Sequence, residues 1–238
     1  MKGSQYSVIK LVESSDFISN VNTLIKTTKA KITVYDNWMP KSLHQDKEAE
    51  LKDFLKYNFT PQLSADIVKW WLHKDSTTPN WDLISTCTIN GKRGILLVEA
   101  KAHWDELDME SHGKNLKSDA SVDSIKNHKK IADAINEANA KIKSTYPQMT
   151  ISRDNCYQLS NRVAHAWWLA NQGIPVVLVY LGFLNCSDMD YNKRKLFKND
   201  KDWQTCFNEH AQKVGVDTIT DNWVDCGNSK FITICRSL

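Results

Sequence analysis

The sequence predicts an α/β fold in which a central mixed sheet is flanked by helices on both sides. Two strand-like runs, residues 81–89 and 93–100, are joined by Asn90-Gly91, which is the strongest short-range signal for a β-hairpin. The apolar run VVLVYLGFL at residues 176–184 is expected of a strand that is buried on both faces. Segments with apolar residues at helical spacing precede, separate and follow these strands, so we expect helices on both faces of the sheet.

Two amphipathic helices are expected in the N-terminal part of the chain, over residues 14–27 and 43–57. Pro61 ends the second helix, and a short third helix begins at Ser64. Each of the first two helices has a stripe of apolar residues that we expect to be buried: Phe17, Val21, Leu24 and Ile25 in the first, and Leu51, Phe54 and Leu55 in the second.

The polar, aperiodic residues 103–120 predict a long loop after the hairpin. Two helices follow, over about 121–144 and 155–171, and a further helix near residues 203–214 precedes a last strand at 231–235. The helix over 121–144 is expected to turn four residues inward: Ile125, Ala132, Ile135 and Ile142.

Length and composition indicate a globular chain of 238 residues, with 41% hydrophobic and 25% charged residues. We expect one domain over residues 1–238, in the cytoplasm, because no run is long and apolar enough for a membrane helix and no secretory signal is recognisable. The six cysteines have no zinc-binding spacing. The net charge of +3 is smaller than is usual for a protein that coats nucleic acid. It does not exclude a nuclease, whose basic groove is offset by acidic metal ligands.

The expected hairpin brings chemically reactive side chains together at one end. If Asn90 and Gly91 form the loop, the numbers of paired residues sum to 181, and Asp82 lies opposite Glu99. Side chains alternate along a strand, so Lys101 shares the face of Glu99. A four-residue loop would change the sum to 183 and would still leave all three side chains on one face.

Two carboxylates at this distance repel each other, and burial raises the cost of both charges. A proton, the ammonium group of Lys101 or a divalent cation can relieve that repulsion. Carboxylate oxygens suit Mg²⁺ or Mn²⁺. The alternative is a structural ion cluster of Asp82, Glu99 and Lys101 at the edge of the sheet.

The stretch PNWDLISTCTINGKRGILLVEAKAH resembles the PD-(D/E)XK nuclease superfamily, which has the restriction-endonuclease-like fold. An Asp begins one strand, and the next apolar strand ends in E-x-K. Together with YQLSNRVAHAWWLA and PVVLVYLGFL, it also resembles a group of uncharacterised bacterial proteins that share this core. The resemblance covers about residues 43–184 and leaves N- and C-terminal additions; Trp81 stands where the superfamily name has Pro.

The resemblance implies a metal-dependent phosphodiesterase site with Mg²⁺ (or Mn²⁺), but it does not imply a substrate. Our hypothesis is an endonuclease that acts on DNA, and the sequence does not distinguish an endonuclease from an exonuclease. Asp82 and Glu99 would bind the metal ion, and the Ala100 carbonyl would add a third ligand. Lys101 would orient the attacking water or stabilise the transition state. The sequence leaves open the form of the substrate, the position of the cut, the pathway and the oligomeric state, with a homodimer among the possibilities.

The superfamily often supplies a further acid from its first core helix. Glu48 borders the buried stripe of the helix expected over 43–57, and its spacing fits this role better than that of Glu50. The alternative is that Glu48 is a solvated acid in a charged run.

Gln158 and Arg162 lie four residues apart on one stripe of a predicted helix. By resemblance Gln158 would hold the metal ligands or the scissile phosphate, whereas Asn155-x-x-Gln158 also matches a capping box. Arg162 is a candidate for binding a substrate phosphate, or an exposed helix arginine. Trp104, in the loop beside the expected site, is a candidate for stacking on a base of the substrate. The functional alternative to a nuclease is a catalytically silent protein on the same fold that binds nucleic acid or another partner.

Overall fold

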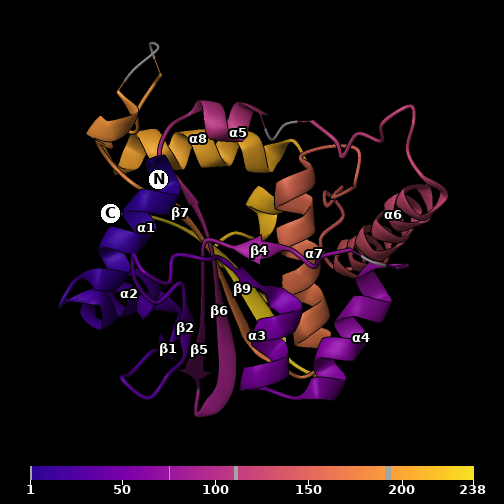
Figure 1. The fold of residues 1–238 in the computed structure, drawn as a ribbon, viewed down its shortest axis with the longest axis horizontal. Coiled ribbons are helices and arrows are strands. Elements are labelled where there is room, and N and C mark those ends of the chain that lie inside the picture. The colour runs from indigo at the N-terminus through magenta and orange to yellow at the C-terminus, as the bar shows by residue number, and fades with distance from the viewer. Residues whose placement is uncertain (1, 75, 110–111, 191–193) are drawn as a thin grey trace.

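The computed structural model describes residues 2–74, 76–109, 112–190 and 194–238. Its main feature is a seven-stranded mixed sheet with the strand order β1-β5-β6-β7-β9-β8, in which β2 also pairs with β5 (Figure 1). A separate ladder joins β3 and β4. The strands are β1 (Ala30–Lys31), β2 (Trp38–Met39), β3 (Ala49–Glu50), β4 (Asn80–Trp81), β5 (Leu83–Ile89), β6 (Lys92–Lys101), β7 (Val176–Gly182), β8 (Trp223–Asp225) and β9 (Lys230–Ser237).

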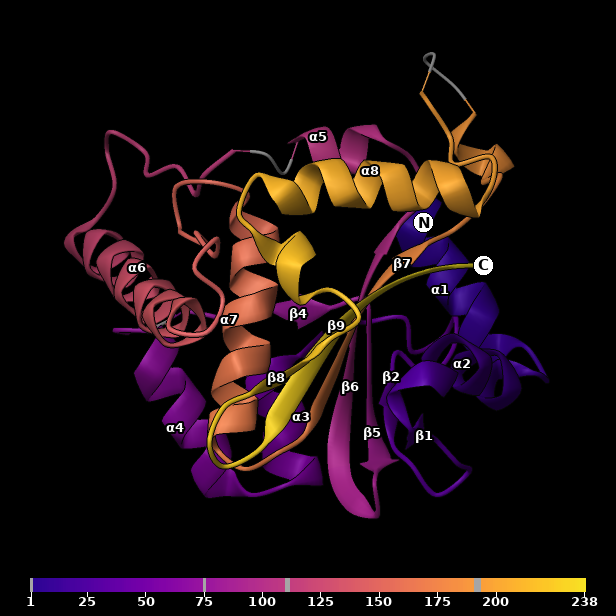
Figure 2. The ribbon, with the colours of Figure 1, turned by 180° about the vertical axis from the view of Figure 1, so that it is seen from behind.

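Helices cover both faces of this sheet, which confirms the predicted α/β class. One face packs against α1 (Gly3–Glu13) and α2 (Phe17–Ile25). The hydrophobic core on the other face includes residues of α3, α4, α6, α7 and α8, with α6 packed against α4 and α7 (Figure 1). These helices are α3 (Leu51–Asn58), α4 (Pro61–Trp71), α6 (Val122–Lys143), α7 (Tyr157–Asn171) and α8 (Asp200–Gln212). A short helix, α5 (Asp105–Met109), lies beside α8 (Figure 2). The 3₁₀ turns are η1 (Lys26–Thr28), η2 (Ser187–Met189) and η3 (Val216–Ile219).

The predicted register of the β5–β6 hairpin is confirmed. Paired residues sum to 181 from Leu83 with Val98 to Ile89 with Lys92. Asn90 and Gly91 both have positive φ angles, 50° and 77°, as a two-residue type I′ turn requires. Because the turn fixes the register, it also fixes which residues share a face at the other end of the hairpin.

The strand β7 is buried along its whole length, as its apolar sequence predicts. It runs parallel to β6 on one side and to β9 on the other. Because β6 and β7 are parallel, the chain between them has to cross over one face of the sheet. The helix α7 belongs to this connection, and it lies on the face that carries Glu99 and Lys101.

Several predicted helix boundaries are wrong. The helix expected over 14–27 is α2, preceded by the unpredicted α1. The helix expected from Ser64 begins at Pro61, because Thr60 caps it by accepting a hydrogen bond from the Leu63 N–H at 3.1 Å. The loop expected over 103–120 contains α5.

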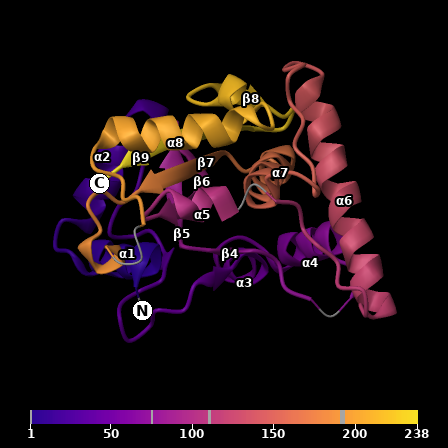
Figure 3. The same cartoon turned by 90° about the horizontal axis from the view of Figure 1, so that it is seen from above.

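The inward face of α6 also differs from the expected one. Ile125 is exposed, whereas Ile131, Ala134, Ile135, Ala138 and Ile142 are buried. Figure 3 shows α6 at the edge of the molecule, at the opposite end from α1 and α2. At its first turns α6 faces the protein with polar side chains, so the apolar stripe begins only at Ile131.

None of the described helices is long and apolar enough to cross a membrane. The six cysteines are free thiols, and all except the half-buried Cys226 are buried.

Candidate functional site

A cleft of about 340 Å³ lies at the end of the hairpin where β5 begins and β6 ends. We refer to it as the acidic cleft. It gathers residues from six parts of the chain: Ser4, Glu48, Asn80, Asp82, Glu99, Ala100, Lys101, Glu106, Gln158 and Arg162. The sequence predictions for Asp82, Glu99, Ala100, Lys101, Glu48, Gln158 and Arg162 therefore converge on one place.

Glu99 is at the centre of the hydrogen bonds in this cleft. Its Oε1 accepts hydrogen bonds from the Lys101 Nζ at 2.6 Å and the Gln158 Nε2 at 2.7 Å. Its Oε2 accepts one from the Arg162 Nε at 2.6 Å. The side chain of Glu99 is only 2% exposed. Burial alone would raise the pKa of Glu99, but the positive charges of Arg162 and Lys101 outweigh burial and lower it, so Glu99 is ionised.

Asp82 is in a different electrostatic position. It lies between β4 and β5, and its Oδ2 accepts a hydrogen bond from the Ala100 N–H at 2.7 Å. Burial and the nearby charge of Glu99 raise the pKa of Asp82 well above its ordinary value, and Lys101 only partly offsets them. The ionised form of this carboxylate therefore lacks a sufficient counter-charge in the protein itself.

Glu48 reaches the cleft, but not from a helix. The helix expected over 43–57 begins only at Leu51, because Ala49 and Glu50 pair with Trp81 and Asn80 in the β3–β4 ladder. Glu48 lines the cleft from the segment that leads into β3. Burial, followed by the charge of Glu99, raises the pKa of the Glu48 carboxyl group.

Glu50 is engaged elsewhere. Its Oε1 accepts a hydrogen bond from the Thr78 N–H at 2.7 Å and pairs with the Lys52 Nζ at 2.9 Å. Glu50 also does not line the acidic cleft. Of the two acids that the sequence offered, the structure brings Glu48 to Asp82 and Glu99.

Gln158 is a site residue and does not belong to a capping box. The residue that caps α7 is Cys156, without a side-chain hydrogen bond, so the capping interpretation is wrong. Besides donating to Glu99, Gln158 accepts a hydrogen bond from the Lys101 Nζ at 3.2 Å through its Oε1. A side-chain amide can both donate and accept, which allows it to bridge a buried carboxylate and a buried ammonium group.

Arg162 is buried, so its interpretation as an exposed helix arginine is wrong. Its side chain is 8% exposed, and the guanidinium carbon lies 4.4 Å from the centre of the Trp81 ring. Among the described residues only its Nε–H donates a hydrogen bond, to Glu99. Arg162 lines the cleft, so its remaining N–H donors are available to a ligand there.

Trp104 is not brought to the cleft. Its ring packs near Phe197, with the ring centres 6.2 Å apart, and the Lys195 Nζ lies 3.2 Å from the centre of the Trp104 ring. A lysine over an aromatic face leaves that face covered, so this position does not favour base stacking by Trp104.

Glu106 is the cleft residue that sequence reasoning missed. Its Oε2 accepts a hydrogen bond from the Ala102 N–H at 3.1 Å, and its Oε1 lies 3.4 Å from the His103 Nε2. Burial raises the pKa of Glu106. The only feature of the sequence that could have indicated Glu106 was its position five residues after Lys101. The short helix α5, which carries Glu106, was not expected because residues 103–120 were predicted to form a loop. Ser4 and Asn80 also carried no signal in the sequence.

The charges of the acidic cleft do not balance. Four carboxylates, from Glu48, Asp82, Glu99 and Glu106, face the two basic groups of Lys101 and Arg162. When all six groups are ionised, a surplus of two negative charges remains. Burial is the main cause of the raised pKa of Glu48, Asp82 and Glu106, and the charge of Glu99 adds to it. Protons relieve that surplus at low pH, and one divalent cation would relieve it at neutral pH.

The donor set also suits a hard cation such as Mg²⁺ or Mn²⁺, because it consists of carboxylate oxygens. Oε1 of Glu99 accepts two hydrogen bonds, from Lys101 and Gln158, whereas Oε2 accepts one, from Arg162. A carboxylate oxygen has two lone pairs, so Oε2 is the Glu99 atom that can still contribute to a cation. In the described ranges, no three His, Cys, Asp or Glu side chains stand in the arrangement of a metal site.

Comparison with known proteins adds no assignment: the chain matches no family model, and neither a curated protein nor a solved structure is significantly similar to it.

Proposed function

We propose that the protein is a metal-dependent nuclease that hydrolyses phosphodiester bonds in DNA, on a restriction-endonuclease-like core. The observation that carries this proposal is the surplus of negative charge in the acidic cleft beside a buried lysine. The order of the parts agrees with the resemblance in the sequence: an Asp before one strand of a hairpin, E-x-K at the end of the next, and a helix that leads into a parallel third strand.

The residues that would hold Mg²⁺ or Mn²⁺ are Asp82 and Glu99, with the Ala100 carbonyl and Glu48 as further oxygen ligands. When bound, a divalent cation would lower the pKa of a water molecule, so that it can attack at neutral pH, and would neutralise negative charge on the phosphate. Burial and the mutual repulsion of the acids, which raise the pKa of Asp82 and of Glu48, favour its binding.

Lys101 would act on the reacting phosphate. Its ammonium group is 6% exposed and lies at the cleft, held by Glu99 and Gln158. From there it can orient the attacking water and stabilise the negative charge that develops on the phosphate oxygens. Gln158 is a positioning residue in this mechanism, because it holds the ammonium group and the carboxylate in fixed relation.

Arg162 has two roles in the proposal. Its Nε–H holds Glu99 in place, and its remaining N–H groups can donate to a non-bridging phosphate oxygen of the substrate. An arginine that anchors a ligand and also faces the substrate retains its charge at every pH at which the enzyme works.

One observation favours the alternative of a silent nucleic-acid-binding protein. Both oxygens of Glu99 already accept hydrogen bonds from charged or polar side chains, so the ion pairs are complete without a metal ion. Such a protein would bind DNA without cleaving it.

The test is a cleavage assay on single-stranded, duplex and branched DNA with Mg²⁺, with Mn²⁺ and with EDTA. We expect metal-dependent cleavage of at least one substrate, its loss in Asp82→Asn, and its retention in the matched control Glu50→Gln. Binding without cleavage under all conditions supports the silent protein. Equal cleavage by wild type and Asp82→Asn would show that the activity does not come from the acidic cleft.

A further inference from the structure

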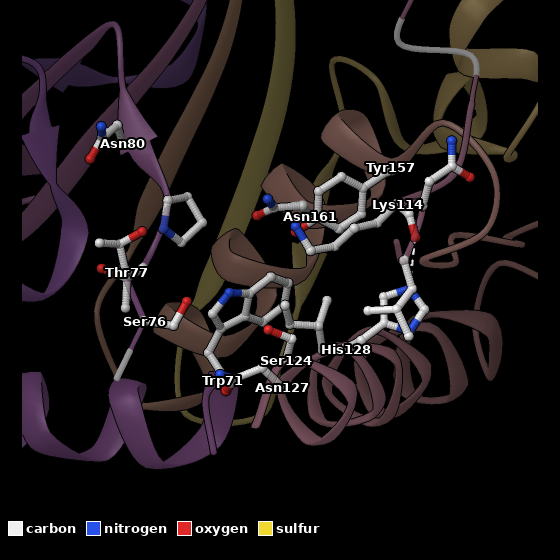
Figure 4. Close-up of a pocket in the computed structure, with 15 residues that line it drawn as sticks. Trp71, Ser76, Thr77, Asn80, Lys114, Ser124, Asn127, His128, Tyr157 and Asn161 are labelled. Carbon is white, nitrogen blue, oxygen red and sulfur yellow. Dashed lines mark hydrogen bonds between the residues drawn. The ribbon is translucent and has the colours of Figure 1, made fainter. Parts of the chain in front are cut away.

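Figure 4 shows a second hollow, which we refer to as the lysine pocket. It shares the lining residue Asn80 with the acidic cleft. Its volume is about 450 Å³, which is within the range of small-molecule sites. It is lined by Trp71, Ser76, Thr77, Thr78, Pro79, Asn80, Lys114, Asn115, Leu116, Ser124, Asn127, His128, Ile131, Tyr157 and Asn161. The proposed mechanism uses none of these residues, so it does not explain the pocket.

The two hollows share structural elements. Asn80 lines both of them. The helix α7 turns Gln158 and Arg162 to the acidic cleft, and it turns Tyr157 and Asn161 to the lysine pocket. Residues four apart on a helix share a face, so the two pairs form adjacent stripes of the same helix. A ligand in the lysine pocket would therefore lie next to a phosphate held in the cleft.

The lysine pocket has the opposite charge to the acidic cleft. Among the residues that the structure describes, no Asp or Glu lines it, and Lys114 is its only lysine. Among the described residues no carboxylate pairs with Lys114; its Nζ lies 5.0 Å from the centre of the Tyr157 ring. Burial lowers the pKa of Lys114 because no counter-charge offsets the loss of solvent. A half-buried ammonium group without a carboxylate is a favourable site for an anionic group.

Lys114 is also held in place by its main chain. Its N–H donates to the Arg153 carbonyl at 2.9 Å, and its own carbonyl accepts from the His128 Nε2 at 2.7 Å. The Arg153 Nη1 in turn donates to the His128 Nδ1 at 2.9 Å, which fixes the neutral Nε2–H form of that ring. A Cβ at Gly113 would lie 2.6 Å from the Asp154 carbonyl oxygen, so the backbone next to Lys114 packs tightly against the backbone of Asp154.

The other side chains that line the lysine pocket indicate the chemical class of its ligand. The side-chain amides of Asn80, Asn115 and Asn161 offer hydrogen-bond donors and acceptors, and Tyr157 and Trp71 add aromatic surface. A nucleotide combines a phosphate for a lysine with a base whose edge carries donors and acceptors and whose faces are apolar. An inorganic phosphate would use only the lysine and would leave most of the pocket empty.

We propose that the lysine pocket binds the nucleotide adjacent to the scissile phosphate, with the phosphate of that nucleotide at Lys114 and its base among the amide and aromatic side chains. This inference rests on the proposed nuclease function, since it identifies the second hollow as a subsite of the same substrate strand.

The test measures binding without cleavage. Deoxynucleoside 5′-monophosphates, the corresponding nucleosides and inorganic phosphate are titrated in EDTA by ligand-observed NMR, with the full-length protein. We expect the monophosphates to bind more tightly than either fragment, and Lys114→Gln to weaken them about tenfold, as expected when a charge-assisted hydrogen bond is lost. The matched control is Lys117→Gln, an exposed lysine of the same loop that does not line the pocket.

Equal binding of inorganic phosphate and monophosphates would overturn the proposal in favour of a simple anion site. Absence of binding, or equal binding by wild type and Lys114→Gln, would also overturn it. Because the titration contains EDTA, its result is independent of catalysis. Nucleotide binding without cleavage of any DNA refutes the nuclease and leaves a nucleotide site, whereas metal-dependent cleavage without nucleotide binding refutes only the subsite.

Discussion

The two neighbouring hollows each contain one lysine, and the two lysines have opposite surroundings. Lys101 lies 2.6 Å from Glu99 in a cleft with four acids, so its charge is compensated within the protein. Lys114 lies in a pocket whose described lining contains no acid, so none of those residues compensates its charge. This difference is the basis for our proposals that the cleft binds a cation and the pocket an anion. Placed side by side, they suit a phosphodiester that is bound together with a divalent cation.

The largest expected effect concerns stability and compares adjacent residues of α7. Arg162→Leu removes the partner of Glu99 at Oε2 and leaves that carboxylate under-compensated, so we expect the free energy of unfolding to fall by about 3–5 kcal/mol. Asn161→Ala, on the side of the lysine pocket, removes no charge and should cost about 1 kcal/mol. Urea denaturation of both variants measures the difference, and equal losses would contradict the central place of the Glu99–Arg162 pair.

The next effect concerns the two lysines directly. Lys101→Ala should lower kcat for DNA cleavage by about 10²–10³-fold, because the ammonium group serves the water and the phosphate. Binding of Mn²⁺, followed by calorimetry, should be nearly unchanged. Lys114→Gln should raise KM and leave kcat similar, because a subsite contact binds ground state and transition state alike. If both variants lose kcat equally, the two hollows do not have separate roles.

A third prediction concerns the charge surplus of the cleft. For an assumed millimolar Kd, about 10 mM Mg²⁺ should stabilise the wild type by roughly 1.4 kcal/mol. In a chain of this size that corresponds to a rise in Tm of roughly 3–6 °C. Asp82→Asn should lose most of this rise. In EDTA it should be at least as stable as the wild type, because an amide oxygen can still accept from the Ala100 N–H. A strongly destabilised variant, with no response of the wild type to Mg²⁺, would instead support a structural ion cluster.

The pH dependence of the same pair of proteins isolates Asp82. The pKa of Asp82 is raised in the folded state by burial and by Glu99, so the folded protein holds this proton more tightly than the unfolded chain. The stability that this contributes is present below about pH 4, the ordinary pKa of Asp, and is lost as the pH rises through the raised value. The advantage of Asp82→Asn in EDTA should therefore grow as the pH rises from about 4. A constant difference between the two proteins over this range would contradict the raised pKa.

The smallest expected effect distinguishes the two acids around β3. Glu48→Gln removes one charge from the cleft and should weaken Mg²⁺ binding about fivefold, as expected for about 1 kcal/mol of electrostatic interaction. Glu50→Gln, two residues away, loses its contacts with Lys52 and Thr78 but leaves the cleft charge unchanged. Its Mg²⁺ affinity should equal that of the wild type. A similar loss of Mg²⁺ affinity in both variants would show that Glu48 is not the specific acid of the site.

The hairpin, its register and the buried strand β7 were predictable from the sequence alone. These features depend on short-range physics: Asn90-Gly91 selects one turn type, the period of two assigns faces, and a wholly apolar strand must be covered on both sides. From them followed the placement of Glu99 and Lys101 on one face, with Asp82 at the start of the partner strand.

The way in which the remaining cleft residues reach the site depends on long-range contacts in the folded protein. A local pattern placed Glu48 on a helix, but pairing of β3 with β4 holds residues 49–50 in extended structure and brings Glu48 to the cleft before the helix begins. Gln158 matched a local cap, yet buried Glu99 and Lys101 supply stronger partners. Each outcome depends on a contact between segments far apart in the chain, and such contacts leave no periodicity in the sequence.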